Sequence, residues 1–112
     1  MSSPSDPSQN AFWDDETQVA TRHRTEVREP PPYRVLFHND DYTTMEFVVH
    51  VLMTVFHHGE SESFRIMMHV HTNGVGVAGV FTREIAETKT AQTTALARKH
   101  EFPLEVTIEA VD

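Results

Sequence analysis

Residues 33–49, YRVLFHNDDYTTMEFVV, hold a β-rich run, an acidic turn and the start of a helix. The run 33–38 alternates, with Val35 and Phe37 on one side, which predicts a half-buried strand. The following Asn-Asp-Asp, residues 39–41, is typical of a turn. Residues 43–46 have the T-x-x-E form of a capping box, so we expect the Thr43 hydroxyl and the Glu46 carboxylate to cap a helix. A strand therefore leads through a polar turn into a helix.

Downstream of this stretch, four further elements are expected. The first helix is predicted over about 44–58 and is ended by Gly59, and the remaining elements are a helix from near Ser61 to Asn73-Gly74, a strand over 75–81, a helix over 84–100 and a strand over 104–109. The order βααβαβ predicts an α+β fold, in which a three-stranded antiparallel sheet packs one face against three helices.

One position in the second helix departs from its pattern. Phe64, Met67, Met68 and His71 recur at the spacing of a single helical face, which predicts that this face is buried. His71 stands where the pattern expects an apolar side chain. We expect it at the core or at the rim of a pocket, and a lone histidine in such a position is more often structural than functional.

The folded domain is predicted to begin at Tyr33. Residues 1–32 are rich in Ser, Pro and charged side chains and have Phe12 and Trp13 as their one large apolar pair, which predicts a disordered N-terminal extension. Prolines 30–32 favour a stiff, extended boundary. Residues 33–112 would then form one small domain.

Composition excludes several classes of function. Nine Lys and Arg against 17 Asp and Glu give a net charge of −8, which disfavours binding to nucleic acid and to anionic membranes. The absence of cysteine excludes disulfides and thiol nucleophiles. With no apolar run long enough for a membrane span and no signal-like start, a cytoplasmic location is expected.

Catalytic motifs are absent or misplaced. Residues 74–79, GVGVAG, match G-x-G-x-x-G, but a predicted helix precedes them and a strand follows, the reverse of the dinucleotide-binding context. We expect these glycines to cap a helix and to allow a close approach of strand and helix. The sequence predicts no enzyme and no cofactor.

Eight histidines leave a metal-binding alternative open. The neighbours His57 and His58 diverge on a helix, as do His69 and His71, so zinc would need a further ligand such as His38 or Asp40. We therefore predict no metal site.

The acidic turn has two interpretations. Taken alone, it is most often a turn whose side chains bond their own backbone. If the two helices pack with these ends together, however, Met45, Met67, Val70 and His71 join the turn around an apolar cavity with carboxylate, amide and imidazole at its mouth. Methionine suits such a cavity because its thioether adapts to different guests.

These residues resemble the ClpS family, the adaptors that deliver N-degron substrates to the ClpA unfoldase of the ClpAP protease. The resemblance runs from Tyr33 through Glu109, and the segments that carry it are YRVL (33–36), NDDYT (39–43), MEFVV (45–49), VH (70–71), GVFT (79–82), AETK (86–89) and PL (103–104). It implies a three-stranded sheet with three helices, an N-terminal extension used in delivery, and a site for a free N-terminal Leu, Phe, Tyr or Trp.

The resemblance also implies roles for individual residues. The α-amino group of the substrate would be held by Asn39, Asp40 and His71, and the side-chain pocket would be lined by Thr43, Met45, Val48, Met67, Val70 and Leu104. Met45 matches the family's gate against β-branched first residues. Glu84 and Lys89 match the surface that docks on the N-terminal domain of ClpA. Thr44 replaces the proline usual in the family. We expect a monomer, and the alternatives are a histidine-based metal-binding protein or a non-selective interaction module.

Overall fold

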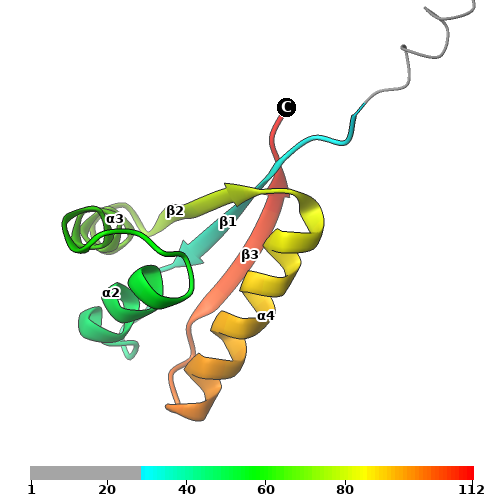
Figure 1. The fold of residues 1–112 in the computed structure, drawn as a ribbon. Helices are drawn as coiled ribbons and strands as arrows, with labels where there is room; N and C mark the ends of the chain where they lie inside the picture. Colours follow the sequence, from blue (N-terminus) through cyan, green and yellow to red (C-terminus); the bar gives the residue numbers. More distant parts are fainter. Residues whose placement is uncertain (1–28) are drawn as a thin grey trace, which may run out of the picture. The chain divides into compact units, whose positions relative to one another are not determined.

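The computed structural model describes residues 29–112. Its elements are β1 (Tyr33–His38), α2 (Met45–Thr54), α3 (Glu60–Asn73), β2 (Val75–Phe81), α4 (Arg83–Lys99) and β3 (Glu105–Ala110) (Figure 1). The predicted order βααβαβ and the α+β class are confirmed. The expected N-terminal extension lies outside the described residues, apart from residues 29–32, which are exposed and have no regular secondary structure.

The sheet is antiparallel, in the order β2-β1-β3, with β1 at its centre. Tyr33 at the start of β1 faces Phe81 of β2 and Ala110 of β3, so both neighbours are paired along its full length. The β1–β2 register shifts between Val35 and Leu36, which leaves Ala78 as the extra residue of a bulge.

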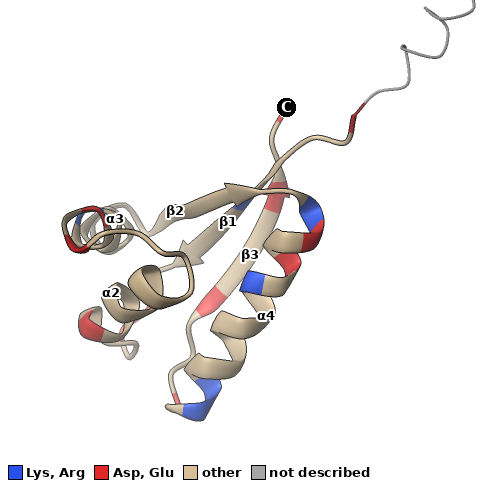
Figure 2. Cartoon of the chain, viewed as in Figure 1, with Lys and Arg blue, Asp and Glu red and all other residues tan. Residues whose placement is uncertain are grey.

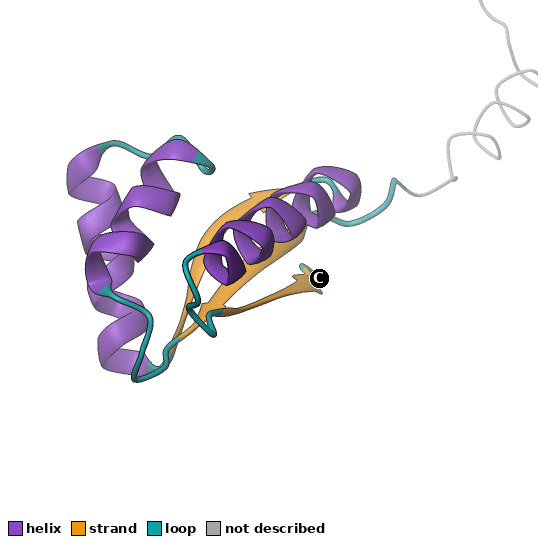
Figure 3. Ribbon diagram, turned by 90° about the horizontal axis from the view of Figure 1, so that it is seen from below, coloured by secondary structure: helices purple, strands orange, loops and turns teal. Residues whose placement is uncertain are grey.

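The helices are divided between one face of the sheet and one end of it. Figure 3 shows α4 lying along one face, while α2 and α3 lie beside each other at one end. The predicted alternation of β1 is confirmed, because Val35 and Phe37 are both fully buried. They belong to a core whose other members are Phe47, Val48, Val51, Leu52, Phe56, Ile66, Met67, Val70, Ala78, Ala86, Ala97 and Leu104.

The start of α2 differs from the predicted capping box by one residue. The N-cap is Thr44, whose hydroxyl accepts a hydrogen bond from the Phe47 amide at 3.1 Å. Thr43 lies in the turn instead, where its hydroxyl donates to the Asp40 carboxylate at 2.8 Å. With Thr44 as the cap, the third helical position is Phe47, so Glu46 is not placed for the reciprocal bond that the predicted capping box requires. Thr43 is thus part of the acidic turn, and Thr44 caps the helix.

The end of α2 also differs, since the helix stops at Thr54 rather than near His58. His57 adopts a positive φ of 63°, a conformation in which a glycine would be the usual sequence signal. The early stop allows Phe56 to turn into the core, where its ring meets Phe37 edge to face at 5.4 Å. Gly59 then becomes the N-cap of α3 instead of the end of α2.

The buried face of α3 is rotated from the one predicted. Ser63, Ile66, Met67 and Val70 are buried, whereas Phe64 and Met68 are 56% and 36% exposed. The prediction of a buried Phe64 and Met68 was wrong. The face of α3 that α2 and β2 cover is shifted by one residue toward the N-terminus, where the small side chain of Ser63 fits. His71 is exposed, which excludes a core position.

Two glycines of the G-x-G-x-x-G match do what their context predicted. Gly74 ends α3 at φ 91° and donates its amide to the Val70 carbonyl at 2.8 Å. A side chain on Gly76 would place its Cβ 2.7 Å from a methyl carbon of Val70, so α3 can approach β2 closely only at a glycine. Within residues 29–112, no helix combines the length and apolar character that crossing a membrane requires.

Candidate functional site

A cavity of about 360 Å³ lies where the turn after β1 meets the start of α2 and the second half of α3. It is lined by Asn39, Asp40, Asp41, Tyr42, Thr43, Thr44, Met45, Val48, Met67, Val70 and His71. The structure therefore brings together all three predicted amine-binding residues and five of the six predicted side-chain residues.

Leu104 is the exception among these residues. It is 1% exposed, belongs to the core and is not part of the cavity lining. It follows α4 and directly precedes β3, so its side chain is enclosed by the same core that holds Val48 and Met67. Leu104 therefore belongs to the same core as these residues and is not part of the cavity lining.

Residues 39–44 are held against the end of α3. The Asn39 amide donates to the Gly74 carbonyl at 2.9 Å, so the turn after β1 is joined to the cap of α3. This bond brings the Asn39 and Asp40 side chains to the same end of the molecule as His71. Both Asn39 and His71 are exposed at the rim of the cavity.

The Asp40 carboxylate organises this turn. One oxygen accepts the amides of Tyr42 and Thr43 at 2.8 and 2.7 Å, and the other accepts the Thr43 hydroxyl at 2.8 Å. Partial burial alone would raise the pKa of Asp40, but these hydrogen bonds and the charge of Arg98 together hold the pKa of the carboxyl below its ordinary value. Asp40 is therefore a stable anion at the mouth of the cavity.

This carboxylate has room for one more donor. Two carboxylate oxygens offer about four lone-pair positions, and three are occupied within the turn. The interpretation of the acidic turn as one whose side chains bond their own backbone is thus confirmed. These bonds do not compete with ligand binding, because the fourth lone-pair position remains on the oxygen that accepts only the Thr43 hydroxyl.

Buried apolar side chains line the interior of the cavity, and an exposed methionine lines its entrance. Val48, Met67 and Val70 are 7%, 4% and 3% exposed, so they form its buried floor. Met45 is 45% exposed at the first position of α2 and stands at the opening. Three residues that the sequence analysis did not assign also line the cavity, namely Asp41, Tyr42 and Thr44. Because they are sequence neighbours of Asp40 and Thr43, the sequence could have indicated that these three residues lie near the cavity.

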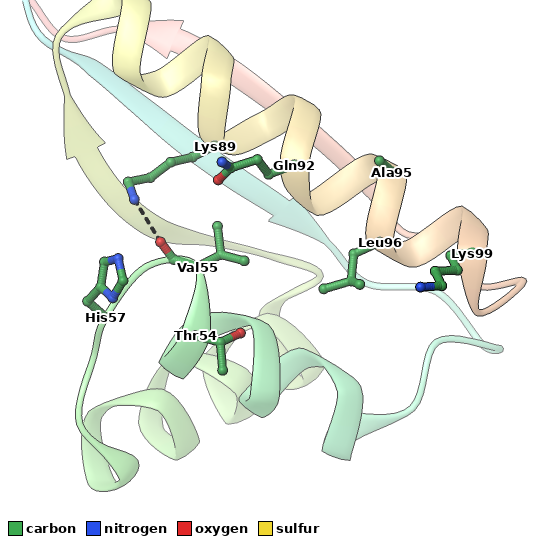
Figure 4. Close-up of a pocket in the computed structure, with 8 residues that line it drawn as sticks. All are labelled: Thr54, Val55, His57, Lys89, Gln92, Ala95, Leu96 and Lys99. Carbon is green, nitrogen blue, oxygen red and sulfur yellow. Dashed lines mark hydrogen bonds between the residues drawn. The ribbon is translucent and has the colours of Figure 1, made fainter.

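The two predicted docking residues lie on α4, away from this cavity. Glu84 is exposed in the first turn of α4. Lys89 is half-buried and donates to the Val55 carbonyl at 2.7 Å (Figure 4). It also lies 5.4 Å from the ring centre of Phe81. A second, larger hollow of about 710 Å³ surrounds this lysine and is lined by Thr54, Val55, His57, Lys89, Gln92, Ala95, Leu96 and Lys99. It has two lysines and no carboxylate in its lining, so it is unsuited to a cationic ligand.

The histidines do not converge. His38 bonds the Thr107 hydroxyl at 2.8 Å, and the Nε2 atom of His58 lies 2.6 Å from the Ala78 carbonyl oxygen. No group of three potential metal ligands occurs among residues 29–112. The described part of the chain therefore offers no observation in favour of the metal-binding alternative.

Comparison with known proteins identifies the family. Residues 28–107 match the family described as "ATP-dependent Clp protease adaptor protein ClpS". The chain belongs to the ClpS family. It is 52% identical over 93 residues to the ClpS adapter proteins of Rhodospirillum centenum and of Caulobacter vibrioides, covering 83% of this chain in both cases and 86% and 85% of the two relatives.

A solved structure shows the same fold. Agrobacterium tumefaciens ClpS2 bound to L-phenylalaninamide aligns with a TM-score of 0.72 and 43% identity, covering 74% of this chain and 100% of that one. ClpS proteins are adaptors of the Clp protease, a role distinct from that of the protease itself.

Removing the Thr43 hydroxyl tests the electrostatics of the turn. In Thr43→Val, we expect the pKa of Asp40 to rise toward its ordinary value, because one of the bonds that favour its ionised form is lost. A folded-state pKa that is lowered stabilises the fold above the unfolded pKa, and this contribution is lost as the pH falls through the folded pKa. The variant should therefore lose less stability on acidification than the parent.

NMR titration of the Asp40 carboxyl carbon, with unfolding followed at each pH, measures both effects. Thr107→Val is the matched control, because its hydroxyl contacts His38 on β1 and not Asp40. An unchanged Asp40 titration in Thr43→Val would contradict the assignment.

Proposed function

We propose that this ClpS-family protein binds proteins through a free N-terminal Leu, Phe, Tyr or Trp and delivers them to the ClpA unfoldase of the ClpAP protease. The observation that carries the proposal is one cavity with an ionised carboxylate at its mouth and apolar side chains within. The phenylalaninamide bound by the A. tumefaciens relative is a free amine joined to such a side chain, which supports the same chemistry here.

The mouth of the cavity suits an α-ammonium group. The three N–H donors of this group match the free position on Asp40, the amide oxygen of Asn39 and a neutral imidazole nitrogen of His71. Hydrogen bonds to charged groups contribute about 1.5 to 3 kcal/mol each. The backbone N–H of Asn39 already donates to the Gly74 carbonyl, so the side-chain amide of Asn39 is the group that would contact the ligand.

The interior suits the side chain of the first residue. Burying a Leu or Phe side chain contributes about 1.5 to 3 kcal/mol, and Val48, Met67 and Val70 supply the apolar surface. Together with the ammonium contacts and less the cost of association, the sum corresponds to a Kd of about micromolar, or about −8 kcal/mol.

Blocking the α-amino group tests the proposal directly. A peptide that begins with free Phe or Leu should bind, and its N-acetylated copy should lose about tenfold or more in affinity, because acetylation removes the charge and leaves Asp40 without its donor. Fluorescence anisotropy with the two labelled peptides measures the difference. Equal affinities for the two peptides would refute the proposal that the cavity binds a free α-amino group.

The gate role of Met45 is tested by first residues that branch at Cβ. Met45→Ala should admit Ile and Val peptides that the parent excludes, because the shortened side chain removes the clash at the cavity entrance. Affinities for matched Leu, Ile and Val peptides provide the measurement, with Val80→Ala as the control, because Val80 is an exposed apolar residue on β2 that does not line the cavity. The role would be refuted by the same selectivity in parent and variant.

We propose that Glu84 and Lys89 contact the unfoldase, and that residues 1–32, which form the extension ahead of β1, assist delivery. The Glu84 side chain is exposed in the first turn of α4, whereas Lys89 is half-buried and also satisfies the Val55 carbonyl beyond the end of α2. Docking is therefore best tested at the glutamate.

Glu84→Gln should weaken binding to the isolated ClpA N-terminal domain by about threefold or more and leave peptide affinity unchanged, since a rim charge in an interface typically carries up to about 1 kcal/mol. Calorimetric titration of the domain gives the affinity. Glu105→Gln, an exposed position on β3, is the control, and equal effects of the two variants would argue against a localised docking surface.

A further inference from the structure

Each helix of the α2–α3 hairpin presents a row of apolar side chains at the surface, and the row on α2 begins at the cavity with Met45. On α2, Met45, Val49 and Met53 are four residues apart and so lie on one side of the helix. On α3, Phe64 and Met68 have the same spacing. Met45, Met53, Phe64 and Met68 are 45%, 38%, 56% and 36% exposed, and Val49 is half-buried. We call these five residues the methionine seam.

The seam is continuous with the cavity at both helices. Met45 belongs to the seam and also lines the cavity. On α3, His71 lines the cavity, and Phe64 and Met68 precede it by seven and three residues, which places them on the His71 side of the helix. The two helices pack against each other and are joined by residues 55–59, so both rows run from the cavity toward that turn.

The length of the seam matches a short peptide segment. Met45 and Met53 are separated by eight helical residues, about 12 Å at 1.5 Å each. An extended chain covers that distance in about four residues. A polypeptide whose first side chain fills the cavity could therefore lay the few residues after its second one along the seam.

The chemistry of the seam favours an apolar occupant. Glu46 is the one charged residue of α2, and the charged residues of α3, namely Glu60, Glu62 and Arg65, lie in its first half, where Glu62 and Arg65 pair with each other (Figure 2). Exposed apolar surface of this kind marks interaction sites, and methionine adapts to varied partners. The other exposed valines, Val75, Val77 and Val80, lie on β2 and do not reach the cavity lining.

We propose that the methionine seam binds apolar residues at about positions three to six of the captured polypeptide, and that recognition thereby extends beyond the first residue. This inference rests on the proposed function of the adjoining cavity. It adds a preference for substrates whose N-terminal segment is both unfolded and apolar, a feature common in chains that have lost their native packing.

Three probes separate this proposal from the function on which it rests. They are L-phenylalaninamide, a peptide beginning Phe-Ser and continuing with Gly and Ser, and the same peptide with Leu and Val at positions three to six. We expect the apolar peptide to bind the parent protein about fivefold tighter than the Gly/Ser peptide, which corresponds to partial burial of two side chains.

The double variant Met53→Gln/Phe64→Gln should abolish this gain and leave the affinity for L-phenylalaninamide unchanged. Val80→Thr, which alters an equally exposed apolar residue on β2, should retain the gain. Thermal unfolding of each variant verifies that the fold is intact.

Each outcome decides a different point. If L-phenylalaninamide does not bind the parent, the cavity itself has another function and the seam proposal falls with it. If it binds but both peptides bind equally, or if the gain survives the double variant, the seam proposal is overturned while the cavity stands. Sedimentation in which the parent dimerises and the double variant does not would assign the seam to a second copy of the chain and would also overturn the proposal.

Discussion

The structure depends on burying the inner side of its central strand. Val35 and Phe37 of β1 have no exposed surface, and β2 and β3 satisfy the backbone of β1 on both edges. The ring of Phe56 packs on Phe37, which requires α2 to stop at Thr54 and the chain to turn at His57 with a positive φ. Lys89 then reaches from α4 to the Val55 carbonyl that this early stop exposes. One packing requirement thus determines where a helix ends and which side chain satisfies the freed carbonyl.

The same constraint positions the candidate site. β1 ends at His38, which pairs with Val75 directly after the C-cap of α3, so the residues that follow fall at the end of the sheet where α3 terminates. The bond from the Asn39 amide to the Gly74 carbonyl joins these two segments, and Gly76 lets α3 approach β2 without a clash at Val70. Asp40 accepts three hydrogen bonds within the turn, and these bonds stabilise its ionised form without any ligand. A preorganised anion of this kind need not be reoriented when a cation binds, which reduces the cost of association.

The exposed surfaces of α4 and of the α2–α3 hairpin differ in composition. The charged residues of α4 lie near its two ends and around Lys89, while the hairpin presents methionines and a phenylalanine beside the cavity together with Glu46, Glu60, Glu62 and Arg65. In the function proposed above, the cavity would meet the polypeptide and α4 the protease component, and their location on different elements is compatible with simultaneous contact. Among the acidic residues that the structure describes, Asp40 is the one to which the proposed function gives a specific use, and the others except Glu62 are exposed.

Sequence by itself determined the order of the elements, the inward side of β1, the C-terminal cap of α3 and the set of polar and apolar residues around the turn. These features follow from short-range spacing and from the chemistry of Asp, Thr and Gly, which act within a few residues. Tertiary structure alone decided the rest. It ended α2 early to bury Phe56, rotated the buried face of α3 so that Phe64 and Met68 became exposed, and enclosed Leu104 in the core rather than in the cavity wall. Each of these depends on which neighbour covers a surface, and helical or strand periodicity describes a face without stating what packs against it.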